Sequence, residues 1–200
     1  MKSITTAITM LCILTILLLP ACSSNMVTYE NEEVRYISVE RTLPFPTDVI
    51  WDRVFMEYGD AHRFNPNVIH SAYIGNIDKA IVGAQRLLQQ DDEGKKVLYE
   101  RIEQINESDR LMRFKIYDAK GIPINTEVTY GESQLIEAGD DSTLFRVQFY
   151  YRTQPKFLAT FANNTLLKDF EDMLIGIEYY LATGEAVTRE NFGKIAEQYQ

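Results

Sequence analysis

The chain has 200 residues, of which 46% are hydrophobic and 12% aromatic, so it is long and apolar enough to fold as one domain with a sizeable core. Its formal net charge is −9 and no basic stretch offsets this charge, which excludes nucleic acid as an expected partner. The sequence has no phosphate loop, dinucleotide fingerprint, zinc-helix motif or nucleophile elbow, and we therefore expect no cofactor and no metal.

The first 21 residues have the pattern of a secretory signal peptide. Residues 8–19 form an apolar run, only Lys2 and the amino terminus carry charge ahead of it, and Ala21 is a small residue at the expected cleavage position. The run is too short to span a bilayer comfortably, since a span takes about 20 apolar residues. We therefore expect residues 1–21 to be removed from the mature protein.

The residues around Cys22 resemble the lipobox of bacterial lipoproteins. Their order is Leu19-Pro20-Ala21-Cys22, and a large residue at Leu19 does not suit ordinary signal peptidase. The resemblance implies that the lipoprotein processing machinery acylates Cys22, which becomes the new N-terminus and a stable membrane anchor. Ser23, where an aspartate would imply the inner membrane, implies the outer membrane facing the periplasm if the host has one. Plain secretion and an uncleaved anchor are the alternatives.

Processing at this position also decides the chemistry that is open to the mature domain. Cys12 leaves with the signal peptide and Cys22 is consumed by lipid, so no disulfide and no cysteine nucleophile is expected. Residues 22–33 are polar and lack a repeating apolar pattern, which predicts a tether between the lipid and the domain.

Residues 34–43 are rich in β-branched and aromatic residues and are predicted to form a strand with one apolar face. Pro44 and Pro46 end this strand, and two short helices are predicted after them. Six strands separated by turn residues follow, over residues 68–74, 83–90, 97–105, 111–117, 124–136 and 143–152. Their short connections require antiparallel neighbours, since a parallel crossover needs a dozen or more residues.

After Pro155 the apolar residues recur at helical spacing, and residues 157–183 are predicted to form one long helix. The side chains expected on its inward face are Phe161, Phe170, Leu174 and Ile177. Gly184 is the candidate C-cap, and residues 185–200 form a polar trailing segment. The predicted fold class is α+β, with a curved antiparallel sheet of about seven strands wrapped around one long C-terminal helix and two short helices after the first strand.

This order of elements resembles the START/polyketide cyclase superfamily, also called SRPBCC or helix-grip domains. The segments that carry the likeness are TLPFPTDVIW (42–51), RFNPNVI (63–69), VGAQR (82–86), YERI (99–102) and LATGEAVT (181–188). The resemblance implies a helix-grip domain over residues 34–193, followed by a tail over residues 194–200. It does not select a function, because the superfamily contains lipid carriers, cyclases and hydrolases.

A sheet curved around one helix leaves a space between them, and strand alternation assigns the side chains that face this space. The expected ligand-binding residues are Arg86, Leu98, Glu100, Met112, Phe114, Ile116, Phe145, Val147, Phe149, Tyr151, Phe170 and Leu174. If Glu100 faces inward, it needs a partner, and Arg86 or Tyr151 is available for that role. If it faces solvent, it pairs with a basic residue on an adjacent strand.

Three functions fit these features. We favour a membrane-anchored envelope lipoprotein whose domain binds a hydrophobic small molecule or lipid in an internal cavity. The first alternative is a cyclase- or hydrolase-type enzyme that uses tyrosines, Glu100 and Arg86 on a hydrophobic substrate in the same cavity. The second alternative is an envelope interaction protein whose cavity is closed. Binding ranks ahead of catalysis because the sequence offers no unambiguous nucleophile or general base.

Overall fold

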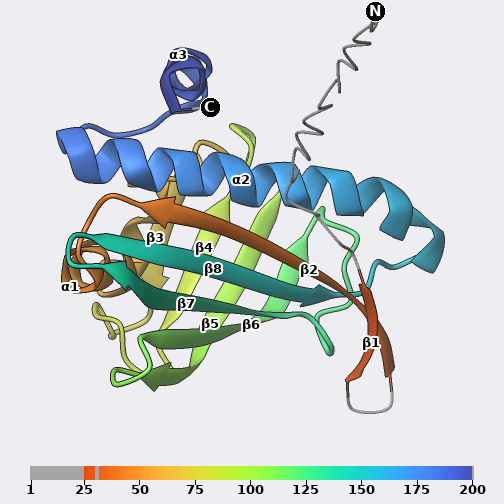
Figure 1. Cartoon of the computed structure of the whole chain (residues 1–200). Coiled ribbons are helices and arrows are strands. Elements are labelled where there is room, and N and C mark those ends of the chain that lie inside the picture. Colours follow the sequence, from red (N-terminus) through yellow and green to blue (C-terminus); the bar gives the residue numbers. More distant parts are fainter. Residues whose placement is uncertain (1–24, 30–31, 200) are drawn as a thin grey trace, which may run out of the picture.

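The computed structural model describes residues 25–29 and 32–199, so the expected signal peptide and Cys22 lie outside the described residues. Figure 1 shows one curved sheet with the long helix α2 lying along it and α3 on the side of α2 away from the sheet. None of the helices in the described ranges is long and apolar enough to cross a membrane. The arrangement is the α+β class that the sequence predicts.

The elements follow the predicted order along the chain. The strands are β1 (Asn25–Tyr29), β2 (Glu32–Leu43), β3 (His70–Ile74), β4 (Gln85–Gln89), β5 (Val97–Asn106), β6 (Leu111–Lys120), β7 (Tyr130–Gly139) and β8 (Ser142–Tyr151). The helical elements are α1 (Thr47–Ile50), the π-helical turn η1 (Trp51–Phe55), the 3-10 segments η2 (Tyr58–Arg63) and η3 (Lys156–Leu158), α2 (Ala159–Thr183) and α3 (Arg189–Tyr199). The strands form one antiparallel sheet in the order β1-β2-β8-β7-β6-β5-β4-β3.

The strand β1 lies inside the segment that was predicted to be a tether. Its backbone pairs antiparallel with β2, with Asn25 opposite Tyr36 and Tyr29 opposite Glu32. A run of five residues shows too little alternation to stand out from a polar segment, which is why the sequence pattern did not indicate it. The sheet therefore has eight strands, of which β2 to β8 are the seven that the sequence predicts.

The helix α3 lies where a trailing segment was predicted, and it crosses the expected domain boundary at residue 193. Val187 and Ile195 are buried, and the Arg41 guanidinium on β2 donates a hydrogen bond to the Tyr199 carbonyl at 2.7 Å. So few buried positions are not enough to show a helical period in the sequence. The domain therefore continues through α3.

The predicted strand over residues 124–136 begins only at Tyr130. Before it, Ile124 makes one isolated bridge with Thr153, and the Asn125 side chain accepts a hydrogen bond from the Glu127 backbone N–H at 2.9 Å. Asparagine side chains that bind nearby backbone groups compete with the sheet ladder in this way. The local turn therefore delays the strand by several residues.

The helix α2 has the predicted position, but Phe161 does not face the sheet. Nine positions separate Phe161 from Phe170, and at about 100° per residue they lie on opposite sides of the helix. The buried positions of α2 include Leu174 and Ile177, whereas Phe161 is 75% exposed. Gly184 ends the helix as predicted, in the left-handed conformation with φ of 74°.

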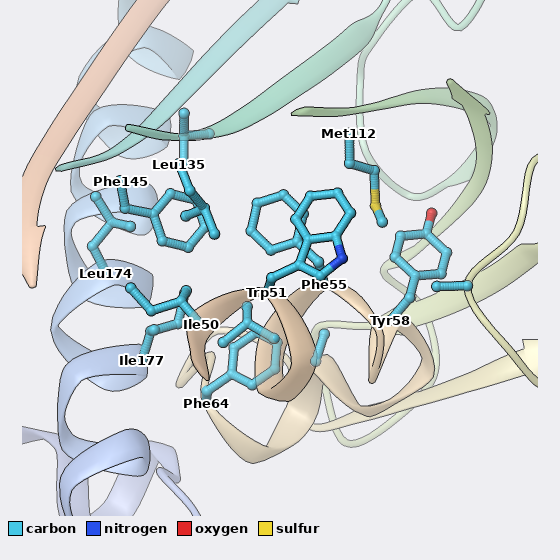
Figure 2. Close-up of a cluster of buried hydrophobic side chains, with 14 of the residues drawn as sticks. Ile50, Trp51, Phe55, Tyr58, Phe64, Met112, Leu135, Phe145, Leu174 and Ile177 are labelled. Carbon is cyan, nitrogen blue, oxygen red and sulfur yellow. The ribbon is translucent and has the colours of Figure 1, made fainter. Parts of the chain in front are cut away.

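The core consists of two clusters of buried side chains. In the larger cluster, the segment from α1 to η2 packs against the sheet and the second half of α2. Figure 2 shows its centre, where Trp51 stacks on Phe55 with ring centroids 4.9 Å apart. The smaller cluster contains Ile37, Phe114, Ile116, Phe149 and Tyr151, and Leu166 and Phe170 of α2 pack against it.

Gly176 allows α2 to pack closely against the segment that follows η2. A Cβ atom at Gly176 would lie 2.2 Å from the Phe64 carbonyl oxygen and 3.4 Å from Pro66. Only a residue without a side chain permits this approach of helix to backbone. The contact supports α2 over the sheet near the boundary between the two clusters.

Candidate ligand-binding site

A cavity of about 140 Å³ lies between the two core clusters and draws its walls from both. Its apolar walls are formed by Val54, Phe55, Phe64, Val68, Leu88, Leu98, Met112, Phe114, Ile116, Phe145, Val147, Phe149, Leu166, Phe170, Met173 and Ile177. The volume is below the ~300–1,000 Å³ that is typical of small-molecule sites. In this conformation the cavity suits a small molecule better than a two-chain lipid.

Ten of the twelve residues predicted to bind a ligand line this cavity. They are Arg86, Leu98, Glu100, Met112, Phe114, Ile116, Phe145, Val147, Phe149 and Phe170. Tyr151 and Leu174 do not line it; each is fully buried, Tyr151 in the smaller cluster and Leu174 in the larger one. These two side chains therefore support the walls, and the binding role of the other ten stays a prediction.

Sequence reasoning missed most of the polar side chains that line the cavity. They are Tyr58, Asn65, Asn67, Gln90, Ser133 and Asp169. Asp169 had a detectable signal, because it follows Leu166 by three residues and precedes Met173 by four on the same side of α2. Asn65 and Asn67 lie in a loop, where no period indicates which way a side chain points.

Glu100 faces the interior, which is the first of the two alternatives considered from the sequence. Only 4% of its surface is exposed, and it lies opposite Arg86 in the pairing of β5 with β4. Arg86 Nε and Nη2 both donate to Glu100 Oε2, at 2.8 Å and 2.6 Å. Glu100 therefore pairs with Arg86, which is one of the two partners that the sequence analysis named.

Tyr58 completes a buried polar cluster with this ion pair. Its hydroxyl donates to Glu100 Oε2 at 3.4 Å, its carbonyl accepts from Arg86 Nη1 at 2.6 Å, and the guanidinium carbon lies 3.8 Å from the ring centroid. Burial, opposed by Arg86, raises the pKa of Tyr58 well above its ordinary value, so the phenol stays protonated. Burial lowers the pKa of Arg86, but Glu100, Tyr58 and Tyr73 together outweigh it and the net shift is upward.

One oxygen of this cluster remains available to a ligand. Every hydrogen bond of the Glu100 carboxylate within the described part of the chain goes to Oε2, and none goes to Oε1. Oε1 is not one of the fully buried polar atoms that lack a hydrogen-bond partner, so part of its surface is accessible. Glu100 also lines the cavity. The cavity therefore offers apolar walls and one carboxylate oxygen that accepts a hydrogen bond.

A second polar group lines the cavity from α2. The Asp169 backbone carbonyl accepts a hydrogen bond from Asn67 Nδ2 at 3.5 Å, which ties α2 to the loop after η2. Burial, and secondly the neighbouring Asp172, raises the pKa of the Asp169 carboxyl above its ordinary value. Asp169 and Asn67 thus give the cavity a polar part distinct from the Glu100 cluster.

The two histidines lie near one another, away from the cavity. The rings of His62 and His70 have centroids 6.1 Å apart, and neither side chain lines the cavity. Across residues 25–29 and 32–199, no three His, Cys, Asp or Glu side chains gather closely enough to hold a metal ion.

No protein-family model and no curated protein matches the sequence. Solved structures do match it. A protein from Nitrosospira multiformis has 15% identity and a TM-score of 0.57, over 74% of this chain and 97% of that chain. XoxI from Bacillus cereus has 14% identity and a TM-score of 0.59, over 74% and 96%. Truncated norcoclaurine synthase from Thalictrum flavum has 14% identity and a TM-score of 0.56, over 82% and 98%.

Likeness at these identities concerns the fold alone. A curved antiparallel sheet, a long C-terminal helix and a cavity between them define the class of helix-grip domains, which confirms the predicted fold class.

Proposed function

We propose that this protein is a membrane-anchored envelope lipoprotein whose helix-grip domain binds a small molecule with an apolar body and one hydrogen-bond donor. The observation that supports this most strongly is an apolar cavity that contains a buried carboxylate with Oε1 of Glu100 unpartnered. Apolar walls favour an apolar body by about 25 cal/mol per Å² buried. The free oxygen favours a hydroxyl or amine, since leaving a buried acceptor unpaired costs ~1–3 kcal/mol.

Filling the cavity from β7 tests this proposal. Ser133 lines the cavity and leaves room for a larger side chain, so Ser133→Leu should occupy part of the space that a ligand needs. We expect it to weaken binding of an apolar fluorophore about tenfold or more, because each displaced methylene is worth ~0.8 kcal/mol. The matched control is Gln134→Leu, one residue further along β7 on the opposite face. Equal binding by both variants in a fluorescence titration would contradict an internal site.

The chemistry of the ligand is tested by competition in the same titration. Alcohols should displace the fluorophore at lower concentration than the methyl ethers of the same chain length, because only the alcohol donates to Glu100 Oε1. The preference should disappear in Glu100→Gln if the variant stays folded. Equal competition by alcohols and ethers would show that the carboxylate is not part of the site.

The anchor has its own test in the two cysteines of the chain. We expect metabolic labelling with a palmitate analogue to mark the wild type and Cys12→Ala, because Cys12 is lost with the signal peptide. Cys22→Ala should lose the label, and it should no longer stay with the membrane fraction after a high-salt wash. A labelled Cys22→Ala variant would show that the lipobox interpretation is wrong.

Catalysis in the same cavity is the second candidate, and the side chains of the site favour it less. Tyr58 stays a protonated phenol and so does not serve as a general base at neutral pH. Glu100 already pairs with Arg86 at 2.6 Å, an arrangement that suits recognition of a donor.

A further inference from the structure

Two aromatic side chains at the start of α2 stand in solvent. Phe157 in η3 is 73% exposed and Phe161 in α2 is 75% exposed, more than any other large hydrophobic side chain over residues 34–199. A separation of four residues places them near one another on the helix surface. Burying one phenylalanine fully is worth ~1.5–3 kcal/mol, so burial of both side chains by a partner would contribute substantially to binding.

Phe157 and Phe161 lie at the end of the molecule that contains β1. Asn25 of β1 is opposite Tyr36 of β2, and Tyr36 is opposite Tyr150 of β8, so Asn25 and Tyr150 are about 10 Å apart across two strand spacings. The strand β8 ends one residue later, and the chain then leads into η3 and α2. Figure 1 shows β1 and the first turns of α2 at the same end of the sheet.

The length of chain between Cys22 and Asn25 is short. Three residues reach at most about 11 Å when fully extended. An acyl chain on Cys22 would therefore hold this end of the domain close to the bilayer.

The charge of the segment that leads from β8 into α2 suits a lipid surface. Residues 142–168 contain no aspartate or glutamate, although the chain as a whole has 29 acidic residues against 20 basic ones. Lys156 is exposed beside Phe157. Lys168 lies two turns beyond Phe161, where it pairs with Asp172. Aromatic and basic residues together are typical of segments that sit at the level of lipid headgroups.

We infer that Phe157 and Phe161 insert into the interfacial region of the bilayer that carries the anchor. The inference rests on the proposed anchoring at Cys22 and adds which face of the domain meets the lipid. It also places the binding site, because Leu166, about one turn further along α2, lines the cavity and packs on the smaller cluster. A ligand that dissolves in the membrane would then have a short path between the lipid and the cavity.

The experiment uses the full acylated chain in vesicles of phosphatidylethanolamine and phosphatidylglycerol. Thr160→Cys provides a single reactive thiol between the two phenylalanines, because processing removes Cys12 and blocks Cys22. An environment-sensitive fluorophore on this thiol should show a blue shift and strong quenching by lipid-borne nitroxide. The control label is Val82→Cys, which is 59% exposed in the loop between β3 and β4, at the opposite end of the molecule. The shift at position 160 should be lost in Phe157→Ser/Phe161→Ser.

The other possible outcomes each support or overturn the contact of Phe157 and Phe161 with the membrane. An acylated, vesicle-bound chain whose labels at positions 160 and 82 behave alike would overturn the contact face and leave the anchor intact. If the chain is not acylated, its Cys12→Ser/Cys22→Ser form, in which the thiol at position 160 is again unique, is added to preformed vesicles, and the label either shifts, which supports the face, or does not, which overturns it. A blue shift without vesicles that grows with protein concentration would assign the pair to contact between two copies and overturn the membrane contact.

Discussion

Replacing Arg86 with methionine is expected to lower the free energy of unfolding by about 3–5 kcal/mol, because Glu100 is then left in the interior without its partner. The side chain of Arg86 is 12% exposed and that of Glu100 is 5% exposed, and the shortest N–O distance between them is 2.6 Å. Methionine fills much of the volume of the arginine stem, so the loss measures the missing charge rather than a cavity. Urea denaturation followed by circular dichroism gives the free energy of unfolding.

The double variant Arg86→Met/Glu100→Leu is the control. It removes both charges together, and apolar replacements of a buried ion pair are often neutral or stabilising. We therefore expect the double variant to be considerably more stable than Arg86→Met. A loss below about 1 kcal/mol for Arg86→Met alone would show that water reaches Glu100 and that the cluster is not the buried group inferred from its burial and hydrogen bonds.

Adding one methyl group at Gly176 is expected to destabilise the protein by about 1–3 kcal/mol or more, the range for overpacked positions. The new Cβ would lie 2.2 Å from the Phe64 carbonyl oxygen, so α2 or the loop after η2 has to move. Helix propensity acts in the opposite direction, since alanine is better than glycine by ~1 kcal/mol inside a helix. If chemical denaturation shows that Gly176→Ala is less stable than the wild type, the cost of the close packing is larger than the gain in helix propensity.

The matched control is Gly193→Ala in α3. No atom lies within 4 Å of a Cβ at this position, so only the propensity gain remains. We expect Gly193→Ala to stabilise the protein by ~0.5–1 kcal/mol if α3 is helical and docked as described. Stabilisation by both substitutions would show that α2 does not rest on the Phe64 backbone.

Alternation along the strands was enough to predict most of the side chains that the strands contribute to the cavity wall, but not those that come from the helical segments and loops. A sheet with one buried face ties every second side chain to the core, and Phe145, Val147 and Phe149 of β8 follow this rule. The pattern does not tell where along the buried face a space remains. Tyr151 continues the alternation of β8, but the side chains around it close the gap.

Glu100 and Phe161 show two further limits of pattern reading. The pairing of β5 with β6 shifts register between Tyr99 and Glu100, so the sequence alone left both faces of β5 open for this carboxylate. Phe161 was predicted to face the sheet because it is large and apolar. Its spacing from Phe170 puts the two side chains on opposite sides of the helix. The strand β1 was not predicted because five residues show too little alternation, and the helix α3 was not predicted because it buries few side chains.

The pairing of β2 with β8 has a consequence for how the chain matures. Leu43 lies opposite Thr143 and Arg35 opposite Tyr151, so the pairing that joins β1 and β2 to the other six strands connects residues roughly a hundred positions apart in the chain. Contacts of such long range close late and slow folding, because the loop entropy is lost before the pairing is gained. A chain that emerges from its amino terminus therefore carries β2 without its β8 partner until residue 151 has followed, and the apolar face of β2 is exposed to aggregation during that interval.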